Sequence, residues 1–325
     1  MLKIKNLLAS VLFFIPQLFF AQYTDVINSN RPGETMSAFG VGKNVIQAEF
    51  GVYGIKEKHD LLDYDASGLG TDLTVRYGAF LEKLEFILDV QYQREKFDTP
   101  YTSYEKNNFR QTVLGAKYLI YDPFRNYKRA KNIYSWKANY TFDWHSLIPA
   151  VSIFAGANFT AARNPYYFSN DGAISPKVVL VTQNLLGGGK WVFVTNIIAD
   201  YITTDYPSYG YVLTLTRGFN DRWSGFIENQ GYKSDFYSDA IVRGGAAYLL
   251  SPNMQIDASI STNFKNTPSV LYGGVGISWR YDGWYKEKQS EVKAEEKSKK
   301  NKDNEMEQRE TDYQEQERKR KSKYE

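Results

Sequence analysis

The chain has 325 residues, a net charge of +3, no cysteine and only two histidines, His59 and His145. The absence of cysteine excludes disulfide bonds, thiolate zinc sites, iron–sulfur clusters and a cysteine nucleophile. The small net charge gives no reason to expect a nucleic-acid partner. After residue 21, no apolar stretch approaches the ~20 residues that a transmembrane helix needs.

Residues 1–21 have the organisation of a secretory signal peptide. Two lysines precede a mostly apolar run that ends at Phe20, and Ala21 offers a small residue for cleavage. A membrane anchor is the alternative, but Pro16 interrupts the run. We therefore predict that the mature chain leaves the cytoplasm.

Residues 22–44 form a polar leader. It contains Pro32 and three glycines, and its composition suits an extended chain better than a helix or a strand. The first run with a regular hydrophobic pattern begins only after this segment.

Twelve runs with an alternating pattern follow between residues 45 and 284. In Met254–Ser261, for example, apolar and polar residues strictly alternate, as in a strand with one apolar and one polar face. The expected strands are 45–54, 70–80, 84–93, 110–121, 146–159, 176–186, 190–200, 208–217, 222–232, 239–250, 254–262 and 269–281.

The connections between these runs alternate in length. Short ones such as 81–83 and 187–189 are followed by longer polar ones such as 55–69 and 94–109. Bacterial outer-membrane barrels have this arrangement. The connection 122–145 is the exception, because it is long on the side of the short turns, and it could hold a small hairpin.

Aromatic residues gather at the strand ends, as in the two interfacial girdles of a membrane barrel. A β-sandwich would also alternate, but its strands need not end in aromatic residues, and a β-helix would show a short fixed repeat. The sequence therefore predicts an all-β fold, a transmembrane antiparallel β-barrel of about 12 strands over residues 45–284, in contact with outer-membrane lipids. The aromatic residues concerned are Tyr53, Phe80, Tyr92, Tyr118, Tyr121, Trp191, Tyr201, Trp223, Tyr232, Tyr248, Trp279 and Tyr281.

A charged tail, residues 285–325, ends the chain. From residue 286 onward, 25 of 40 residues are charged, 13 basic and 12 acidic, so the tail cannot bury a core and is expected to be disordered or a solvated helix. An even number of strands returns both termini to the same side, which we expect to be the periplasm of a Gram-negative bacterium. The tail is then either a solvated extension or a contact with the cell wall or a periplasmic partner.

Both ends of the barrel region resemble a known family. Ser29-Asn30-Arg31-Pro32-Gly33-Glu34-Thr35, the run Gly42–Glu49, the run Leu250–Ser259 and the closing run Gly273–Tyr281 are similar to outer-membrane proteins known as "putative MetA pathway of phenol degradation" or transporter. The resemblance covers residues 27–284. It implies a barrel that passes small, often apolar molecules, without an established substrate, and it implies nothing for the 122–145 connection or the tail.

In such a barrel the polar face of each strand lines the lumen. The charges could form a paired network that fills a narrow barrel or line a pore and set its selectivity, and we favour a constricted pore. The leader would then sit in the mouth as a plug, with Arg31, Pro32, Gly33 and Glu34 as candidates, although a loose leader is the alternative. The candidate lumen residues are Glu49, Asp72, Arg76, Glu85, Asp89, Lys117, Glu228, Arg243, Asp257 and Arg280.

These features favour a channel or transporter for small molecules, apolar or aromatic. The alternative is a structural barrel that presents its charged tail. A lipid hydrolase, which needs a serine beside a histidine, is disfavoured, because His59 and His145 are expected on opposite sides of the membrane. We expect no catalytic residue, cofactor or metal.

Overall fold

The structure is a computed structural model that describes residues 26–124, 144–161, 163–167, 173–235 and 237–283. The predicted signal peptide, most of the 122–145 connection and the charged tail 285–325 lie outside the described residues. Within the described part, no helix is long and apolar enough to cross a membrane.

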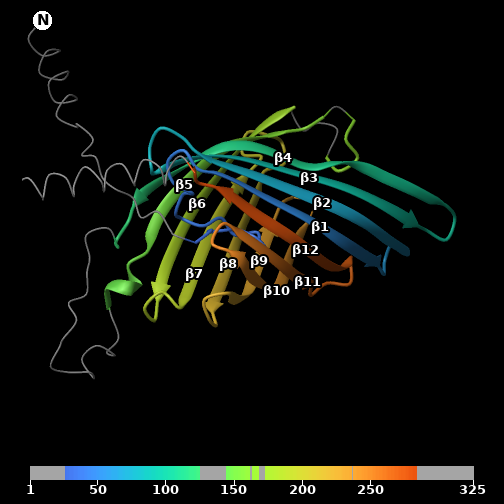
Figure 1. Ribbon diagram of the computed structural model, residues 1–325. Helices are drawn as coiled ribbons and strands as arrows, with labels where there is room; N and C mark the ends of the chain where they lie inside the picture. The colour runs from blue at the N-terminus through green and yellow to red at the C-terminus, as the bar shows by residue number, and fades with distance from the viewer. Residues whose placement is uncertain (1–25, 125–143, 162, 168–172, 236, 284–325) are drawn as a thin grey trace, which may run out of the picture. The chain divides into compact units, whose positions relative to one another are not determined.

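Twelve antiparallel strands of the described chain close into a barrel (Figure 1). Each strand pairs with its neighbours along the chain, and the last returns to the first, with Ile46 opposite Tyr281. The predicted fold, an antiparallel barrel of about 12 strands, is confirmed. The strands are β1 (Ile46–His59), β2 (Tyr64–Gly78), β3 (Leu84–Asp98), β4 (Ser103–Tyr121), β5 (Ala150–Phe159), β6 (Ile174–Leu186), β7 (Trp191–Asp200), β8 (Ser208–Gly218), β9 (Trp223–Lys233), β10 (Ser238–Ser251), β11 (Met254–Asn263) and β12 (Ser269–Tyr281).

The first four strands are longer than predicted. Most of the expected loops 55–69 and 94–109 continue β1 to β4 as a projecting hairpin sheet. The prediction failed because outward side chains there are polar, for example Lys56 and Arg94, so the hydrophobic alternation disappears while the backbone pairing continues. The strand expected over 146–159 begins later, at Ala150, after a short 3-10 helix, η1 (Trp144–Leu147).

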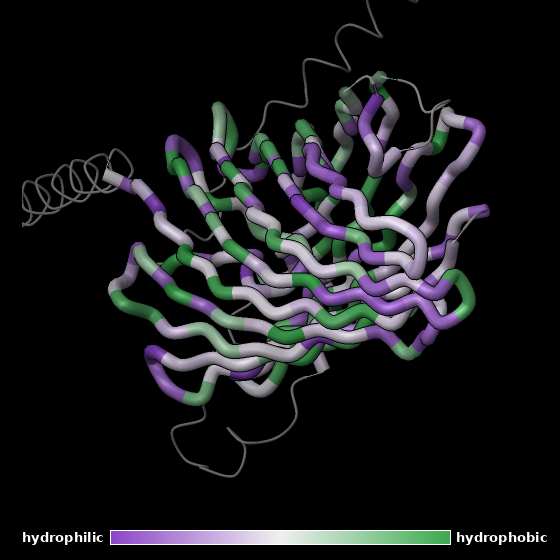
Figure 2. The backbone as a smooth tube through the Cα atoms, turned by 90° about the vertical axis from the view of Figure 1, so that its right-hand side faces the viewer, coloured by the Kyte–Doolittle hydropathy of each residue, from purple (hydrophilic) through white to green (hydrophobic). Residues whose placement is uncertain are grey.

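The outward face of the barrel is apolar. Aliphatic side chains that a water-soluble protein would bury are exposed around the whole sheet, and hydrophobic positions alternate with polar ones along the strands (Figure 2). Such a band around a polar interior is the arrangement of a barrel that faces lipid. The exposed residues include Val52, Leu73, Leu88, Leu114, Ile153, Leu180, Ile197, Leu215, Ile227, Ile256, Ile260, Val275 and Ile277.

Two of the aromatic residues assigned to the outer girdles point inward instead. The Tyr53 hydroxyl donates a hydrogen bond to Gln93 Oε1 at 2.8 Å, and Tyr232 lines the lumen. The place of Tyr53 was misjudged, because β1 continues to His59 and leaves Tyr53 in mid-strand on the inner face. Tyr232 does lie at the end of β9, but on the face that lines the lumen. Trp223, in contrast, is 49% exposed on the outer surface, as a girdle residue should be.

The two ends of the barrel differ. At the end called here the turn end, short connections join β2 to β3 and β6 to β7; the latter is a Gly187–Gly189 turn whose three positive φ angles (59°, 71° and 86°) favour glycine. At the opposite end, the loop end, the connections include residues 160–173 between β5 and β6. Both the first strand and the last strand reach the turn end, where the chain enters and leaves the barrel.

Candidate functional site

The ten charged residues predicted for the lumen all lie on inner-face positions of their strands. Seven of them are buried, each less than 9% exposed, and the other three, Asp72, Asp89 and Arg243, line a cavity. The seven buried residues are Glu49, Arg76, Glu85, Lys117, Glu228, Asp257 and Arg280.

A buried ion-pair network occupies the turn-end half of the lumen. Arg76 Nε lies 2.9 Å from Glu85 Oε1, and its Nη1 lies 3.3 Å from Glu49 Oε1. Lys117 Nζ approaches the same Glu85 oxygen at 3.1 Å. These side chains are at most 1% exposed, so the charges compensate one another where water does not reach.

The cations of this region also hold the backbone of the leader, of which residues 26–44 are described. Arg76 Nη1 donates to Asn28 O at 2.7 Å, and Lys117 Nζ donates to Ser37 O at 2.7 Å. The leader therefore runs through the lumen and supplies hydrogen-bond acceptors to the inner wall.

Carboxylates of the wall accept hydrogen bonds from the amides of the leader. The Glu49 carboxylate accepts from the backbone N–H of Arg31 at 3.2 Å, and Glu228 accepts from that of Glu34 at 3.1 Å. Charge-assisted bonds of this kind are stronger than neutral ones.

Two neutral amides, which the sequence analysis missed, also bind the leader. Gln183 Oε1 accepts from the backbone N–H of Ala38 at 2.9 Å. Asn196 accepts from the N–H of Met36 at 2.7 Å and donates to its carbonyl at 3.0 Å. Both amides lie on the inner faces of their strands, but those faces also carry the buried Val179, Val181 and Val194. The hydrophobic alternation of β6 and β7 therefore does not mark these amides as lumen residues.

Arg31 is the most deeply engaged side chain of the leader. It forms ion pairs with Asp72 and, at 3.3 Å, with Asp257. Its guanidinium lies against the backbone of Gly51 and Gly276, where an added Cβ would come within 2.3 Å of it. Gly51 and Gly276 face each other on β1 and β12, so paired glycines make the space that Arg31 fills.

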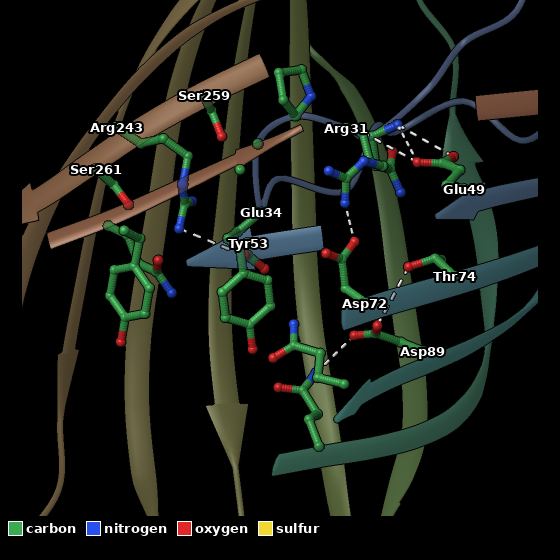
Figure 3. Close-up of a pocket in the computed structure, with 18 of the residues that line it drawn as sticks. Arg31, Glu34, Glu49, Tyr53, Asp72, Thr74, Asp89, Arg243, Ser259 and Ser261 are labelled. Atoms are coloured by element: carbon green, nitrogen blue, oxygen red, sulfur yellow. Dashed lines mark hydrogen bonds and ion pairs between the residues drawn. The ribbon is translucent and has the colours of Figure 1, made fainter. Parts of the chain in front are cut away.

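Two cavities meet at the leader. Figure 3 shows residues that line the loop-side cavity. The loop-side cavity has a volume of about 240 Å³, and the turn-side cavity about 220 Å³. Residues Asn30, Arg31, Pro32 and Gly33 line both of them. This short stretch of the leader is therefore the wall between the two cavities.

Glu34 faces the loop-side cavity and is 45% exposed. Its carboxylate lies 3.5 Å from Arg243, which also pairs with Glu228.

Asp89 differs from the other predicted lumen acids. It accepts hydrogen bonds from Thr74 Oγ1 at 3.3 Å and from Gln111 Nε2 at 2.8 Å (Figure 3). No lysine or arginine among the described residues lies within ion-pair distance of it. Among the six predicted lumen acids, Asp89 is thus the one that only neutral groups contact.

The two histidines lie at opposite ends of the barrel. His59 ends β1 at the loop end, where its Nδ1 accepts from the backbone N–H of Leu62, and His145 lies in η1 near the start of β5. No group of three or more histidines, aspartates and glutamates able to hold a metal ion occurs in the described part of the chain.

A family model described as "Putative MetA-pathway of phenol degradation" matches residues 29–281. The chain belongs to this family. The match begins inside the leader and ends at the last residue of β12, so the family includes the segment that crosses the lumen as well as the barrel. The resemblance inferred from the sequence is confirmed.

Several solved structures are similar to this chain. An outer membrane channel from Pseudomonas putida F1 is 12% identical, with 78% of this chain and 100% of that chain covered and a TM-score of 0.50. The translocator domain of the autotransporter NalP from Neisseria meningitidis is 8% identical, with 73% and 88% covered and a TM-score of 0.44. The monoaromatic hydrocarbon channel CymD is 10% identical, with 73% and 88% covered and a TM-score of 0.39. No curated protein sequence matches the chain.

Proposed function

We propose that the protein is an outer-membrane channel for small molecules, apolar or aromatic, whose lumen is closed by its own leader. The single observation that carries this proposal is the pair of cavities that share residues 30–33 as their wall. These residues belong to no strand, so they can move without breaking the barrel. Displacing them would join the cavities into one passage.

The surface and the interior of the barrel agree with this role. The exposed aliphatic band suits contact with acyl chains, whereas the inner wall carries the charges and amides. The channel of Pseudomonas putida F1, whose fold this chain shares, is described as an outer membrane channel. Membership of a family described by phenol degradation favours small aromatic solutes over large polar ones.

The composition of the loop-side cavity supports the same solute class. Tyr53, Tyr232 and Tyr272 line it together with Ile87 and Ile241. Its volume of about 240 Å³ is below the 300–1,000 Å³ usual for drug-sized ligands. A molecule of about one ring is the size that it suits.

We place both termini in the periplasm. The first and last strands reach the turn end, and short turns face the periplasm in bacterial barrels. The leader would then enter the lumen from the periplasmic mouth, and the charged tail would extend on the same side.

Deletion of residues 23–40 tests the channel directly. The variant keeps the signal segment and all twelve strands, and we expect a several-fold higher single-channel conductance in a planar bilayer than the full-length protein shows. A gel shift between unboiled and boiled samples checks that the barrel is folded. A folded variant whose conductance equals that of the full-length protein would contradict the proposal.

A further inference from the structure

One arginine of the loop-side cavity forms no ion pair with a carboxylate of the described residues. Of the arginines that line this cavity, Arg31 pairs with Asp72 and Asp257, and Arg243 pairs with Glu228 and Glu34. The third, on β4, has no carboxylate among the described residues within 4.0 Å. It is Arg110, which the sequence analysis did not single out.

Arg110 is held by neutral groups through one nitrogen. Its Nη1 donates to Gln93 Oε1 at 3.0 Å and to the Tyr272 hydroxyl at 3.4 Å. Its Nε and Nη2 protons have no hydrogen-bond acceptor among the described residues. The Nε–Nη2 edge of a guanidinium is a rigid fork that matches the two oxygens of a carboxylate, so the unoccupied edge is a binding group for a carboxylate.

A β-bulge aims Arg110 into the lumen. Gln91 on β3 faces Gln111, but the next residue, Tyr92, faces Phe109, so Arg110 is the extra residue of β4. A bulge re-aims a side chain and is common beside functional sites. The freed carbonyl of Arg110 accepts a hydrogen bond from the Tyr167 hydroxyl at 2.7 Å, which fixes the bulge in place.

Aromatic rings surround this guanidinium. Its central carbon lies 5.8 Å from the centre of the Tyr272 ring, and Tyr53 packs edge-on against Tyr272 with ring centres 6.2 Å apart. Tyr232 lines the same cavity. A planar ring attached to a carboxylate would therefore find tyrosine faces and edges beside the charge that binds its oxygens.

We propose that the loop-side cavity is a binding site for a small aromatic carboxylate. The carboxylate occupies the Nε–Nη2 edge of Arg110, and the ring packs among Tyr53, Tyr232 and Tyr272. The proposal rests on the proposed function, because it names the class of solute that the channel admits. Glu34 and Asp89 line the same cavity, and Asp89 accepts a hydrogen bond from Gln111, the residue after Arg110. These two negative charges oppose the binding of a carboxylate, whereas the Arg110 fork and the tyrosine rings favour it.

Equilibrium binding to the full-length protein in detergent tests the site, with benzoate, the neutral benzyl alcohol and benzylammonium as probes. Titration calorimetry should show benzoate bound at least about tenfold more tightly than either of the others, the size of effect expected from one charge-assisted bidentate contact. Arg110→Gln should remove this preference. Arg110→Lys, which keeps the charge and loses the fork, should retain part of it.

Asp89→Asn is the matched control, since it changes a charge of the same cavity away from the fork. Benzoate affinity should be unchanged or slightly higher in this variant. Equal affinity of the native protein for benzoate and benzyl alcohol, or unchanged benzoate affinity in a folded Arg110→Gln variant, overturns the site. Should that variant fail to fold, unchanged benzoate affinity in Arg110→Lys overturns it equally.

Uptake of the same probes into proteoliposomes separates this inference from the proposed function. A protein that binds benzoate through Arg110 but admits none of the probes retains the site and contradicts the channel. A protein that admits benzoate and benzyl alcohol equally, with no change in Arg110→Gln, retains the channel and overturns the site.

Discussion

Two parts of the barrel contain ion pairs of the same kind, buried in one part and exposed to solvent in the other. In the turn-end half, Arg76 lies between two carboxylates, and its side chain has no solvent exposure. In the projecting sheet of β1 to β4, Arg94 pairs with Glu105 at 2.7 Å, but the two side chains are 64% and 47% exposed. The first network is locked to the leader, whereas the second lies in solvent, where such pairs contribute little.

The buried ion pairs stabilise the barrel, whereas the leader closes the lumen. Buried pairs inside the barrel define the inner wall on which the leader docks, and removing one partner leaves a charge that water cannot reach. Surface pairs of the projection can be removed without that consequence. Variants of the buried network should therefore lose more folding stability than variants of the projecting sheet. Variants of the leader should instead change the conductance relative to the native protein.

The largest loss of stability is expected for Glu85→Gln. The change keeps the shape of the side chain but leaves Lys117 without a carboxylate at 3.1 Å and Arg76 with only one. Breaking a buried ion pair costs about 3–5 kcal/mol. Urea unfolding in detergent should show this loss, and Glu105→Gln, the same substitution in the exposed pair, should unfold with the native midpoint. Equal unfolding midpoints for the two variants would contradict the expected difference between the buried and the exposed ion pairs.

A charge on the outer face should be nearly as costly. Ala258 is exposed on the outer side of β11, and the next residue, Ser259, lines the loop-side cavity. Ala258→Arg should destabilise the barrel by about 2–4 kcal/mol, because it places a cation against acyl chains near the midplane. Ser259→Arg should cost less, and refolding into lipid vesicles measures both. The reverse order would show that the inner and outer faces are exchanged.

Gly276→Leu should open the channel. A side chain at this position collides with the Arg31 guanidinium, whereas Gly273, on the outer face of the same strand, has no atom within 4 Å of an added Cβ. We expect Gly276→Leu to raise the conductance several-fold and Gly273→Leu to leave it unchanged. A conductance that responds to neither variant would show that the contact between Arg31 and Gly276 does not hold the leader in place.

Asp89→Asn should have the smallest effect, a change in ion preference. Its carboxylate contacts only Thr74 and Gln111, whose hydrogen bonds an amide can largely replace. In the leader-deleted background, reversal potentials should shift toward anions, because one negative charge of the lumen has been removed. An unchanged reversal potential would place Asp89 away from the ion pathway.

The sequence could predict most of the barrel because lipid and lumen impose a period of two on each strand. It could not predict the ends of β1 to β4, since the outward side chains of the projecting sheet are polar and Lys56 or Arg94 look like loop residues. The bulge at Arg110 could not be predicted either, because one extra residue in β4 shifts the phase of the alternation.

The lumen charges were predictable one at a time, but their partners were not. Glu85 and Arg76 lie on strands whose alternation marks them as inward, yet only the closed structure shows that they bind each other and the leader. Gly51 and Gly276 illustrate the same limit. They lie 20 and 245 residues from Arg31 in the chain, yet the Arg31 side chain lies directly against both of them in space.

The most direct test of the central claim is to lock the leader to the wall and then release it. Thr35 and Thr214 are in hydroxyl contact, and the chain has no cysteine of its own, so the double variant Thr35→Cys and Thr214→Cys can form a single defined disulfide. In the Gly276→Leu background, the oxidised protein should show the low conductance of the native channel, and reduction should raise it several-fold. A conductance that is equal before and after reduction, with the disulfide shown to form, would contradict the account that the leader closes the lumen.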